Sequence, residues 1–419
     1  MEVTDAHETI ALLQYTGGTT GLSKGAMLTH ANLLANLTQL MAIIQQPPEK
    51  EHVFLALLPL FHVFGLTITL LLPARMAARV VPMPRYVPAD MLEAFKKYQF
   101  TAFIGAPSVY ISLLQQKNLA QYDLHHIIFC ISGSAPMPVE WLKKFEEVTG
   151  TPITEGFGLT EASPVTHANP VFGKQKPGSI GVPVPGTLAR IVDTEDGERV
   201  LAHNEIGELV IKGPQVMKGY WNRPEETART IRDGWLYTGD IAYMDEEGYF
   251  YIVDRKKDLI IVGGYNVYPR EIDEVLHTHP KIREAVTGEA PPPPPKVGKA
   301  VTVGVNHRSR GETVKAYIVP EEGANLTVPE VVAFCRQKLA SFKVPRLIEF
   351  REELPKTMVG KVLRRILREE ELHKSDTEQD KEQLVPEETS KEEVSAPEAG
   401  IGEKEAKTQG EPEKTDGNA

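Results

Sequence analysis

Short apolar runs alternate with amphipathic segments between Met27 and about Thr151. The runs HVFLALLPL, ARVVPMP, FTAFIGAP and HIIFCISG have the length and the apolar content of buried strands. The amphipathic segments ADMLEAFKKYQ and VEWLKKFEEVTG show a helical pattern of apolar positions. Buried strands that are separated by helices predict an α/β fold with a parallel sheet.

The pattern changes twice further along the chain. From Gly178 to Ile252, short strands are separated by Gly, Pro, Asp and Asn, as in GELVIKGPQVMKGYW, which predicts a small antiparallel β unit. After Asp254, helical segments such as REIDEVLHTHP alternate with strands such as VKAYIVP. We therefore expect a first domain over residues 1–254, with a β subdomain at about 178–252, and an α+β domain over 255–370. The charged stretch DRKKD between the two domains fits a hinge.

One uncharged run, Val53 to Leu72, is long enough to span a membrane on hydropathy alone. Pro59, His62 and Gly65 interrupt its middle and favour a buried strand, a turn and a buried helix instead. The N-terminal stretch MEVTDAHETIALLQ has no basic segment followed by an apolar one, so we expect no signal peptide and a cytoplasmic protein.

The charge and the residue composition differ most from the rest of the chain near the C-terminus. From His373 to Ala419, 14 Asp and Glu residues stand against 6 Lys, so this segment carries −8 of the net charge of −11 and leaves −3 for the rest. Because it also has few aromatic or branched residues, we expect a disordered, solvated acidic tail over residues 371–419. The nearly balanced body has no basic stripe, which argues against nucleic-acid binding. Cys130 and Cys335 lie far apart in apolar stretches, so we expect buried thiols and no disulfide.

The segment LLQYTGGTTGLSKGAMLTHANLLAN, from Leu12 to Asn36, joins a loop rich in Gly, Thr, Ser and Lys to a helix-like stretch. Its glycines let the backbone curl and point N–H groups inward, and its hydroxyls and the ammonium of Lys24 add donors. Such a loop favours phosphate. It is not the P-loop pattern G-x-x-x-x-G-K-[ST], and taken alone it also fits an ordinary turn.

Residues Thr16 to Gly25 resemble the phosphate loop of the adenylate-forming superfamily, which contains acyl-CoA synthetases, luciferases and peptide-synthetase adenylation domains. Further matches follow in the family's order. LPLFHVFGL resembles the acyl-pocket motif, and the resemblance implies that His62 lies near the substrate carboxylate. SGSAP resembles the adenine-side loop. EGFGLTE resembles the most diagnostic motif, in which Phe157 would stack on adenine, Thr160 would bond phosphate and Glu161 would ligate Mg2+.

The matches continue into the second domain. GWLYTGD resembles the ribose motif, with Asp240 as acceptor of bonds from the ribose hydroxyls. VDRKKDLIIVGGYNVYPREIDEVL resembles the hinge, where Arg255 would assist the ribose side and Lys257 would be the pivot. LPKTMVGKVLRR carries Lys361, the adenylation lysine of the family. Taken singly, His62 and Phe157 each fit a core position and Lys361 fits a solvated surface. The order and spacing of the motifs favour the functional interpretation instead.

The resemblance implies a large layered α/β adenylation domain with a small β-barrel-like subdomain, hinged to a small mobile α+β domain. For catalysis it implies Lys361, Lys24, Glu161 and His62, with Glu161 as the metal ligand. For nucleotide and coenzyme binding it implies Thr16, Gly17, Gly18, Thr19, Thr20, Gly21, Lys24, Gly133, Ser134, Ala135, Pro136, Glu155, Gly156, Phe157, Gly158, Thr160, Asp240, Ile252, Arg255, Lys257, Gly263, Gly264 and Lys361.

The implied reaction is ATP-dependent activation of a fatty acid to acyl-AMP and transfer of the acyl group to coenzyme A (CoA), with release of pyrophosphate and AMP. Its cofactors would be ATP, Mg2+ and CoA. Three stretches of the sequence are most similar to bacterial long-chain fatty acyl-CoA synthetases: LQYTGGTTG, GPQVMKGYW and FKVPRLIEFREELPKTMVGK. A fragment that only binds nucleotide and an enzyme that delivers the acyl group to a carrier protein remain alternatives. Peripheral membrane contact and a homodimer also stay open.

Two features depart from the family pattern. Only fifteen residues precede the phosphate loop, where members carry a whole subdomain. A fragment, an alternative start and a portion supplied by another chain are the interpretations left open, and we expect an exposed apolar patch where that portion docks. The stretch EAPPPPPK, Glu289 to Lys296, interrupts the second domain and is expected to be a stiff surface insertion.

Overall fold

The computed structural model describes residues 5–16, 23–44, 51–84, 86–135, 137–279, 281–282, 299–307, 311–321, 323–355 and 362–377. All of them belong to one compact unit, Met1–Leu384. The predicted Pro-rich insertion at 289–296 and the acidic stretch after Thr377 lie outside the described residues.

A mixed sheet forms the centre of the first domain, with seven strands within the described residues in the order β4-β3-β5-β6-β7-β8-β9. The strands from β4 to β7 run parallel, and β8 and β9 pair antiparallel at the other edge. In chain order the strands are β3 (Val53–Ala56), β4 (Arg79–Pro82), β5 (Ala102–Gly105), β6 (Phe129–Ser132), β7 (Ile153–Gly158), β8 (Val165–Ala168) and β9 (Val182–Pro183). The predicted parallel α/β architecture is confirmed, and the antiparallel edge was not predicted.

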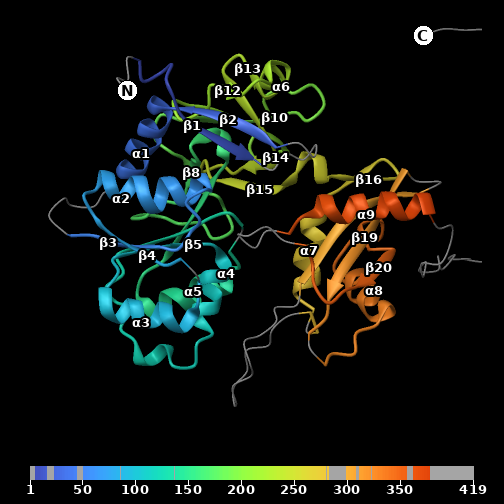
Figure 1. Ribbon diagram of the computed structural model, residues 1–419. Coiled ribbons are helices and arrows are strands. Elements are labelled where there is room, and N and C mark those ends of the chain that lie inside the picture. Colours follow the sequence, from blue (N-terminus) through green and yellow to red (C-terminus); the bar gives the residue numbers. More distant parts are fainter. Residues whose placement is uncertain are drawn as a thin grey trace, which may run out of the picture. The chain divides into compact units, whose positions relative to one another are not determined.

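Helices cover both faces of this sheet (Figure 1). One face carries α3 (Pro88–Tyr98), α4 (Pro107–Leu114), α5 (Val139–Thr149) and the short η2 (Leu119–Gln121). The other carries α1 (His30–Ile44), η1 (Gly65–Leu71) and α2 (Leu72–Arg75). Because side chains alternate along a strand, Phe103 of β5 enters the core cluster on the first face, and its neighbour Ile104 enters the cluster on the second. Cys130 and Cys335 are buried thiols, as predicted.

The uncharged run Val53 to Leu72 forms a strand, a turn and a helix, as its interruptions predict. The helical part, η1, is a π-helix that begins at Gly65, where a Cβ would lie 2.2 Å from the carbonyl oxygen of Pro59. In the part of the chain that the structure describes, no helix combines the length and the apolar character needed to cross a membrane.

A hairpin of β1 (Ile10–Thr16) and β2 (Lys24–Thr29) precedes α1, and β12 (Gly219–Tyr220) adds a third strand to it. Asn32 fixes this arrangement, because its amide donates to the carbonyl groups of Pro214 and Val216, each at 2.8 Å. Tyr15 and Phe61 are 60% and 65% exposed, and the Gln14 amide donates to the Phe61 carbonyl at 2.8 Å.

The segment from Gly178 to Ile252 contains the predicted antiparallel sheet, in the order β10-β11-β14-β13, with β15 paired to β14. Its elements are β10 (Leu188–Val192), β11 (Gly207–Lys212), α6 (Pro224–Thr230), β13 (Ile231–Arg232), β14 (Trp235–Met244) and β15 (Phe250–Arg255). Ala26 and Leu28 of β2 share a core cluster with Leu209 and Leu236 of this sheet, so the hairpin rests on the β subdomain.

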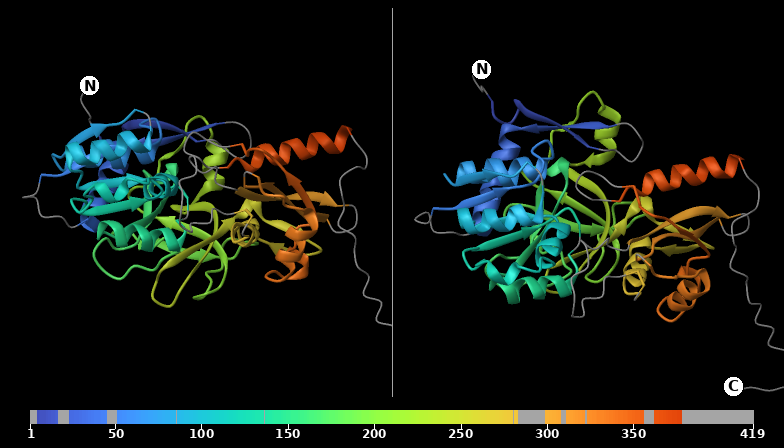
Figure 2. Two further views of the ribbon diagram at one scale, coloured as in Figure 1. Left: turned by 90° about the horizontal axis from the view of Figure 1, so that it is seen from below. Right: turned by 60° about the horizontal axis from the view of Figure 1, so that its bottom comes forward.

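The α+β part follows β15. Its sheet has the order β17-β16-β19-β18, and β20 pairs with β19. The elements are η4 (Lys256–Asp258), β16 (Ile260–Val262), β17 (Tyr265–Val267), α7 (Pro269–His277), β18 (Lys299–His307), β19 (Gly311–Val319), α8 (Val328–Arg336), η5 (Ser341–Lys343), β20 (Leu347–Phe350) and α9 (Arg364–Thr377). Figures 1 and 2 show α9 on one side of this sheet and α8 on the other. The predicted start of the tail at residue 371 is too early, because α9 continues to Thr377 and Glu371 bonds with Lys315 and Tyr317 of the sheet.

Candidate functional site

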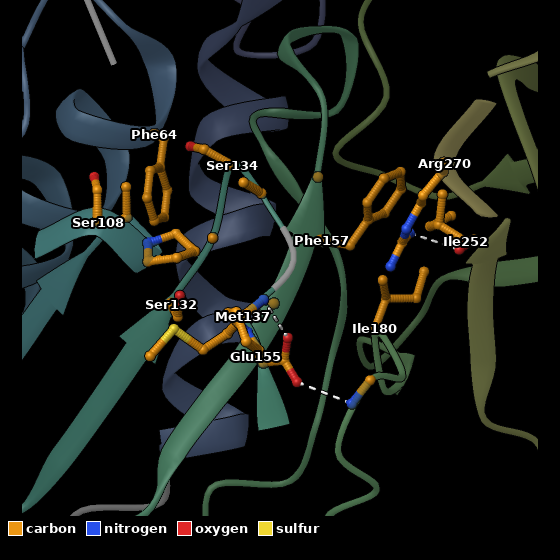
Figure 3. A pocket seen from close by; sticks show the side chains of 18 of the residues that line it. Phe64, Ser108, Ser132, Ser134, Met137, Glu155, Phe157, Ile180, Ile252 and Arg270 are labelled. Carbon is orange, nitrogen blue, oxygen red and sulfur yellow. Dashed lines mark hydrogen bonds between the residues drawn. The ribbon is translucent and has the colours of Figure 1, made fainter. Parts of the chain in front are cut away.

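One large cavity collects most of the predicted site residues. Its volume is about 2530 Å³. The carboxyl ends of β6 and β7 open into it, which is the usual ligand position in a parallel α/β sheet. The predicted residues that line it are Thr16, Lys24, His62, Gly133, Ser134, Ala135, Glu155, Gly156, Phe157, Gly158, Thr160, Glu161, Asp240, Ile252, Arg255 and Lys257. Part of the lining is drawn in Figure 3.

The predicted phosphate loop connects the two strands of the hairpin. Thr16 at the end of β1 pairs with Lys24 at the start of β2, so both lie at the mouth of the loop. The loop residues Gly17, Gly18, Thr19, Thr20 and Gly21 lie outside the described residues.

Four side chains meet beside this mouth, and we call them the Tyr220 cluster: Lys24, Glu161, Tyr220 and Glu226. Lys24 forms an ion pair with Glu226 of α6, and its Nζ lies 5.3 Å from the centroid of the Tyr220 ring. The Tyr220 hydroxyl donates to Oε1 of Glu161 at 2.7 Å. Burial and the Glu161 charge raise the pKa of Tyr220, so the hydroxyl keeps the proton that it donates. The residues predicted for phosphate and for metal thus contact the same aromatic side chain.

The surroundings of Glu161 fit a magnesium ion that binds together with a nucleotide. Glu161 lies in the 3-10 turn η3 (Thr160–Ala162), where its carbonyl accepts the Met217 N–H at 2.8 Å. The described residues contain no group of three or more His, Cys, Asp or Glu that could hold a metal. Mg2+ prefers oxygen ligands and usually takes one or two protein carboxylates, with water and substrate phosphates completing its shell. Glu161, beside the mouth of the predicted phosphate loop, matches that pattern, and the second carboxylate of the cluster, Glu226, is paired with Lys24.

Phe157 presents its ring to the cavity from β7. The ring packs edge-on against His167 of β8 with a centroid distance of 6.2 Å, and Figure 3 shows it pointing toward Ile252 and Ile180. Gly158 follows it, because a Cβ there would lie 2.1 Å from the carbonyl oxygen of Pro164. An aromatic face at this place can stack on a nucleotide base.

Glu155 braces the neighbouring loop. Its carboxylate accepts the N–H groups of Met137 at 3.1 Å and Gly178 at 3.2 Å (Figure 3). Burial raises the pKa of Glu155, and the two N–H donors partly oppose this by stabilising the charged form. Glu155 therefore orients the SGSAP loop, in which Pro136 lies outside the described residues.

Asp240 and Arg255 pair across neighbouring strands. They lie opposite each other on β14 and β15, and Arg255 Nε is 3.0 Å from Asp240 Oδ1. Asp240 is only 4% exposed, and its carboxylate has further acceptor sites for the hydroxyls of a sugar. Lys257 of η4 also lines the cavity, and burial, together with the Arg255 charge, lowers its pKa to about 8.

His62 and a set of apolar side chains also line the cavity. His62 accepts the Phe64 N–H on Nδ1 at 3.2 Å, which places the proton of a neutral ring on Nε2. The Phe64 ring covers Gly133, where a Cβ would lie 3.0 Å from the ring, and so joins this part of the lining to the SGSAP loop. The lining also includes the apolar side chains of Leu40, Ile43, Ile44, Ile68 and Ile111.

Two groups of predicted residues are not part of this lining. Gly263 and Gly264 form the turn between β16 and β17 with φ of 56° and 85°, a left-handed conformation that glycine adopts readily. Among the described residues, no atom lies within 4 Å of a Cβ built on either glycine. Lys361 lies outside the described residues, and the Leu363 N–H, just after it, donates to the Pro355 carbonyl at 2.9 Å.

The sequence did not single out Tyr220 and Glu226 as site residues. Their contact with Lys24 depends on the pairing of the two-residue strand β12 with β2, where Tyr220 lies opposite Ala26. A strand of this length leaves no periodic pattern. The Gly–Tyr pair followed by Pro224 predicts a turn and a helix start. It does not predict which other segment of the chain this turn packs against.

Comparison with known proteins identifies the family. Residues 1–221 match the AMP-binding enzyme family, and residues 294–361 match the AMP-binding enzyme C-terminal domain. A long-chain-fatty-acid–CoA ligase of Bacillus subtilis (strain 168) is 52% identical over 367 residues, which is 88% of this chain and 63% of the relative. One from Escherichia coli O157:H7 is 44% identical over 373 residues, again 63% of its own length. The chain therefore spans about 63% of these curated relatives.

Solved structures agree with this result. ATP-bound MatB from Rhodopseudomonas palustris matches with a TM-score of 0.79 at 34% identity, over 88% of this chain and 69% of that one. The O-succinylbenzoate coenzyme A synthetase from Bacillus subtilis in complex with AMP matches with a TM-score of 0.75 at 29% identity, over 90% and 71%. The motif order, the fold and these matches together show that the chain belongs to the family of AMP-binding, adenylate-forming enzymes.

Proposed function

We propose that this chain is an AMP-forming acid–thiol ligase of the cytoplasm, which activates a long-chain fatty acid with ATP and transfers it to CoA. The observation that carries the proposal is the shared cavity, in which Lys24, Phe157 and Asp240 lie in one lining with apolar side chains of α1 and η1. The ligases at 44% and 52% identity support the choice of a fatty acid as substrate.

In the first half-reaction, a carboxylate oxygen bonds to the α-phosphorus of ATP while the bond to pyrophosphate breaks. Two anions must approach each other, so the site has to supply positive charge and aligned donors. Lys24 and Lys361 would supply charge, while Phe157 and Asp240 would hold the nucleoside in line for the attack. Mg2+, held by Glu161, would supply further positive charge at the phosphates.

In the second half-reaction, the thiol of CoA attacks the acyl carbonyl carbon and AMP leaves. A neutral His62 ring that accepts the Phe64 N–H on Nδ1 carries its proton on Nε2, and this N–H would donate to the acyl group. Gly263 and Gly264, which lie outside the cavity lining, would leave room for the thiol arm because they carry no side chain. Lys257 would be the pivot for the change between the two half-reactions.

The variant Lys361→Ala tests whether Lys361 is needed for the first half-reaction and not for the second. We expect it to abolish ATP–pyrophosphate exchange, because the charge at the α-phosphate is lost, and to leave thioester formation from a supplied acyl-adenylate largely intact. Lys356→Ala, in the same segment, is the matched control and should retain both half-reactions. Equal loss of both half-reactions in Lys361→Ala would contradict the assignment.

The substrate is tested by AMP release over a series of fatty acids of increasing chain length. The proposal expects AMP release that depends on CoA and is greatest for long chains. Adenylate formation without CoA-dependent release would favour a carrier-protein acceptor. ATP binding without either reaction would favour a binding-only chain.

A further inference from the structure

Tyr220 lies between the side chain proposed for the metal and the side chain proposed for phosphate. Its hydroxyl donates to Glu161 Oε1 at 2.7 Å, and its ring lies 5.3 Å from Lys24 Nζ. A hydrogen bond to one carboxylate oxygen leaves the second oxygen for a cation and fixes the direction in which it points. Outer partners of this kind set the affinity of a metal site although they never touch the metal.

Tyr220 is well placed for this task because its own position is fixed. It is 7% exposed and packs in a core cluster with Ala26 and Met217. Its backbone N–H donates to Thr227 Oγ1 at 2.9 Å, and its strand β12 pairs with β2. The hydroxyl is therefore attached to the same hairpin that carries the phosphate loop.

We propose that Tyr220 is a positioning residue for the metal–nucleotide complex, whose hydroxyl orients the Glu161 carboxylate toward the phosphates beside Lys24. This inference rests on the proposed function, because that function makes Glu161 the metal ligand. Tyr220 links the two groups, so metal binding and the phosphate loop depend on one side chain.

The test measures binding of Mn2+, a paramagnetic substitute for Mg2+, to the full chain with ATP and without acyl substrate. Electron paramagnetic resonance gives the Mn2+ concentration for half-saturation. Tyr220→Phe removes the hydroxyl and keeps the ring beside Lys24, and we expect this concentration to rise about tenfold or more. ATP binding in the presence of EDTA should not change.

Tyr249→Phe is the matched control. Tyr249 is also 7% exposed, and its hydroxyl also donates at 2.7 Å, but to the Lys174 carbonyl. We expect this variant to bind Mn2+ as the wild type does. In a double-mutant cycle, Tyr220→Phe should change Mn2+ binding less than twofold when Glu161→Gln is already present, because Tyr220 then has no carboxylate to orient.

The possible results separate the two proposals. Wild-type binding of Mn2+ with an unaffected Tyr220→Phe variant overturns the role of Tyr220 alone. An equally large loss in the Glu161→Gln background, or a Tyr220→Phe chain that does not fold, also overturns it, because the hydroxyl then serves the fold rather than Glu161. A wild-type chain that binds no Mn2+ with ATP overturns the proposed function as well.

Discussion

At the scale of single residues, the positive charge of Lys24 is already partly neutralised by a neighbouring carboxylate. Its ammonium pairs with Glu226, and the two side chains are 15% and 32% exposed. Bound phosphate would have to share Lys24 with this carboxylate or displace it. Because the pair is partly solvated, we expect it to be worth no more than about 1 kcal/mol.

Glu226→Gln should therefore strengthen ATP binding, by up to about fivefold, because it removes a negative charge beside the phosphates. Isothermal titration calorimetry at low salt measures the dissociation constant. Glu225→Gln is the control on the same helix, since Glu225 is 89% exposed and lies 4.0 Å from Arg229. Equal constants for both variants, or weaker binding in Glu226→Gln, would show that Glu226 does not compete with the nucleotide.

How far the site could be predicted depends on how each residue acts. Lys24, Phe157 and Asp240 belong to motifs that resemble those of a known family, and the structure brings them to one cavity. Tyr220 and the bracing bonds of Glu155 were not predicted as such, because they act through pairings between distant segments. Such pairings depend on the assembled fold and leave no local spacing to read.

At the scale of elements, α9 is attached to the C-terminal sheet by a buried charge. Lys315 of β19 is 1% exposed, and its Nζ lies 3.0 Å from Glu349 of β20 and 2.9 Å from Glu371 of α9. The Tyr317 hydroxyl also donates to Glu371 at 2.7 Å. These two bonds attach the last turns of the described chain to the C-terminal sheet.

Lys315→Met should lower the free energy of unfolding by about 3 kcal/mol or more, because it removes the buried cation that pairs with Glu349 and Glu371. Urea denaturation followed by circular dichroism measures this. Lys281→Met is the matched control, since Lys281 pairs with Glu330 at 2.7 Å with side chains that are 41% and 36% exposed, and it should change stability little. A loss in Lys315→Met no larger than in the control would contradict a structural role for the buried pair.

The elements themselves were predictable where they carry a strong pattern. The apolar runs around β3, β5 and β6 and the amphipathic α3 and α5 follow the predicted segments. The edge strands β8 and β9 and the short β12 were not predicted, because two to four residues carry too little periodicity and their partners are distant. The tail was predicted too early because α9 is polar along most of its length, and of its described side chains only Leu367 is buried in the core cluster of the sheet, while ion pairs also hold the helix.

At the scale of the whole molecule, His167 couples the stability of the fold to pH. It is fully buried on β8 between Phe157 and Phe250, with ring centroids 6.2 Å and 4.7 Å away. Its Nδ1 bonds to Thr166 Oγ1 at 2.9 Å, and burial lowers its pKa to about 3. The folded chain therefore keeps this ring neutral where an unfolded chain would protonate it.

The sign of the effect follows from proton binding. An unfolded histidine has a pKa of about 6.5. Below that pH the unfolded state binds more protons at position 167 than the folded state does. The free energy of unfolding therefore falls as pH falls toward 3. Between pH 7 and pH 5 the loss from this residue is about 2 kcal/mol. Urea denaturation at the two pH values should show that His167→Asn removes this difference, whatever its own stability at pH 7. His203 is exposed, so His203→Asn should keep the wild-type difference in the free energy of unfolding between pH 7 and pH 5. If His167→Asn also kept that difference, the buried ring would not be what makes the fold sensitive to acid.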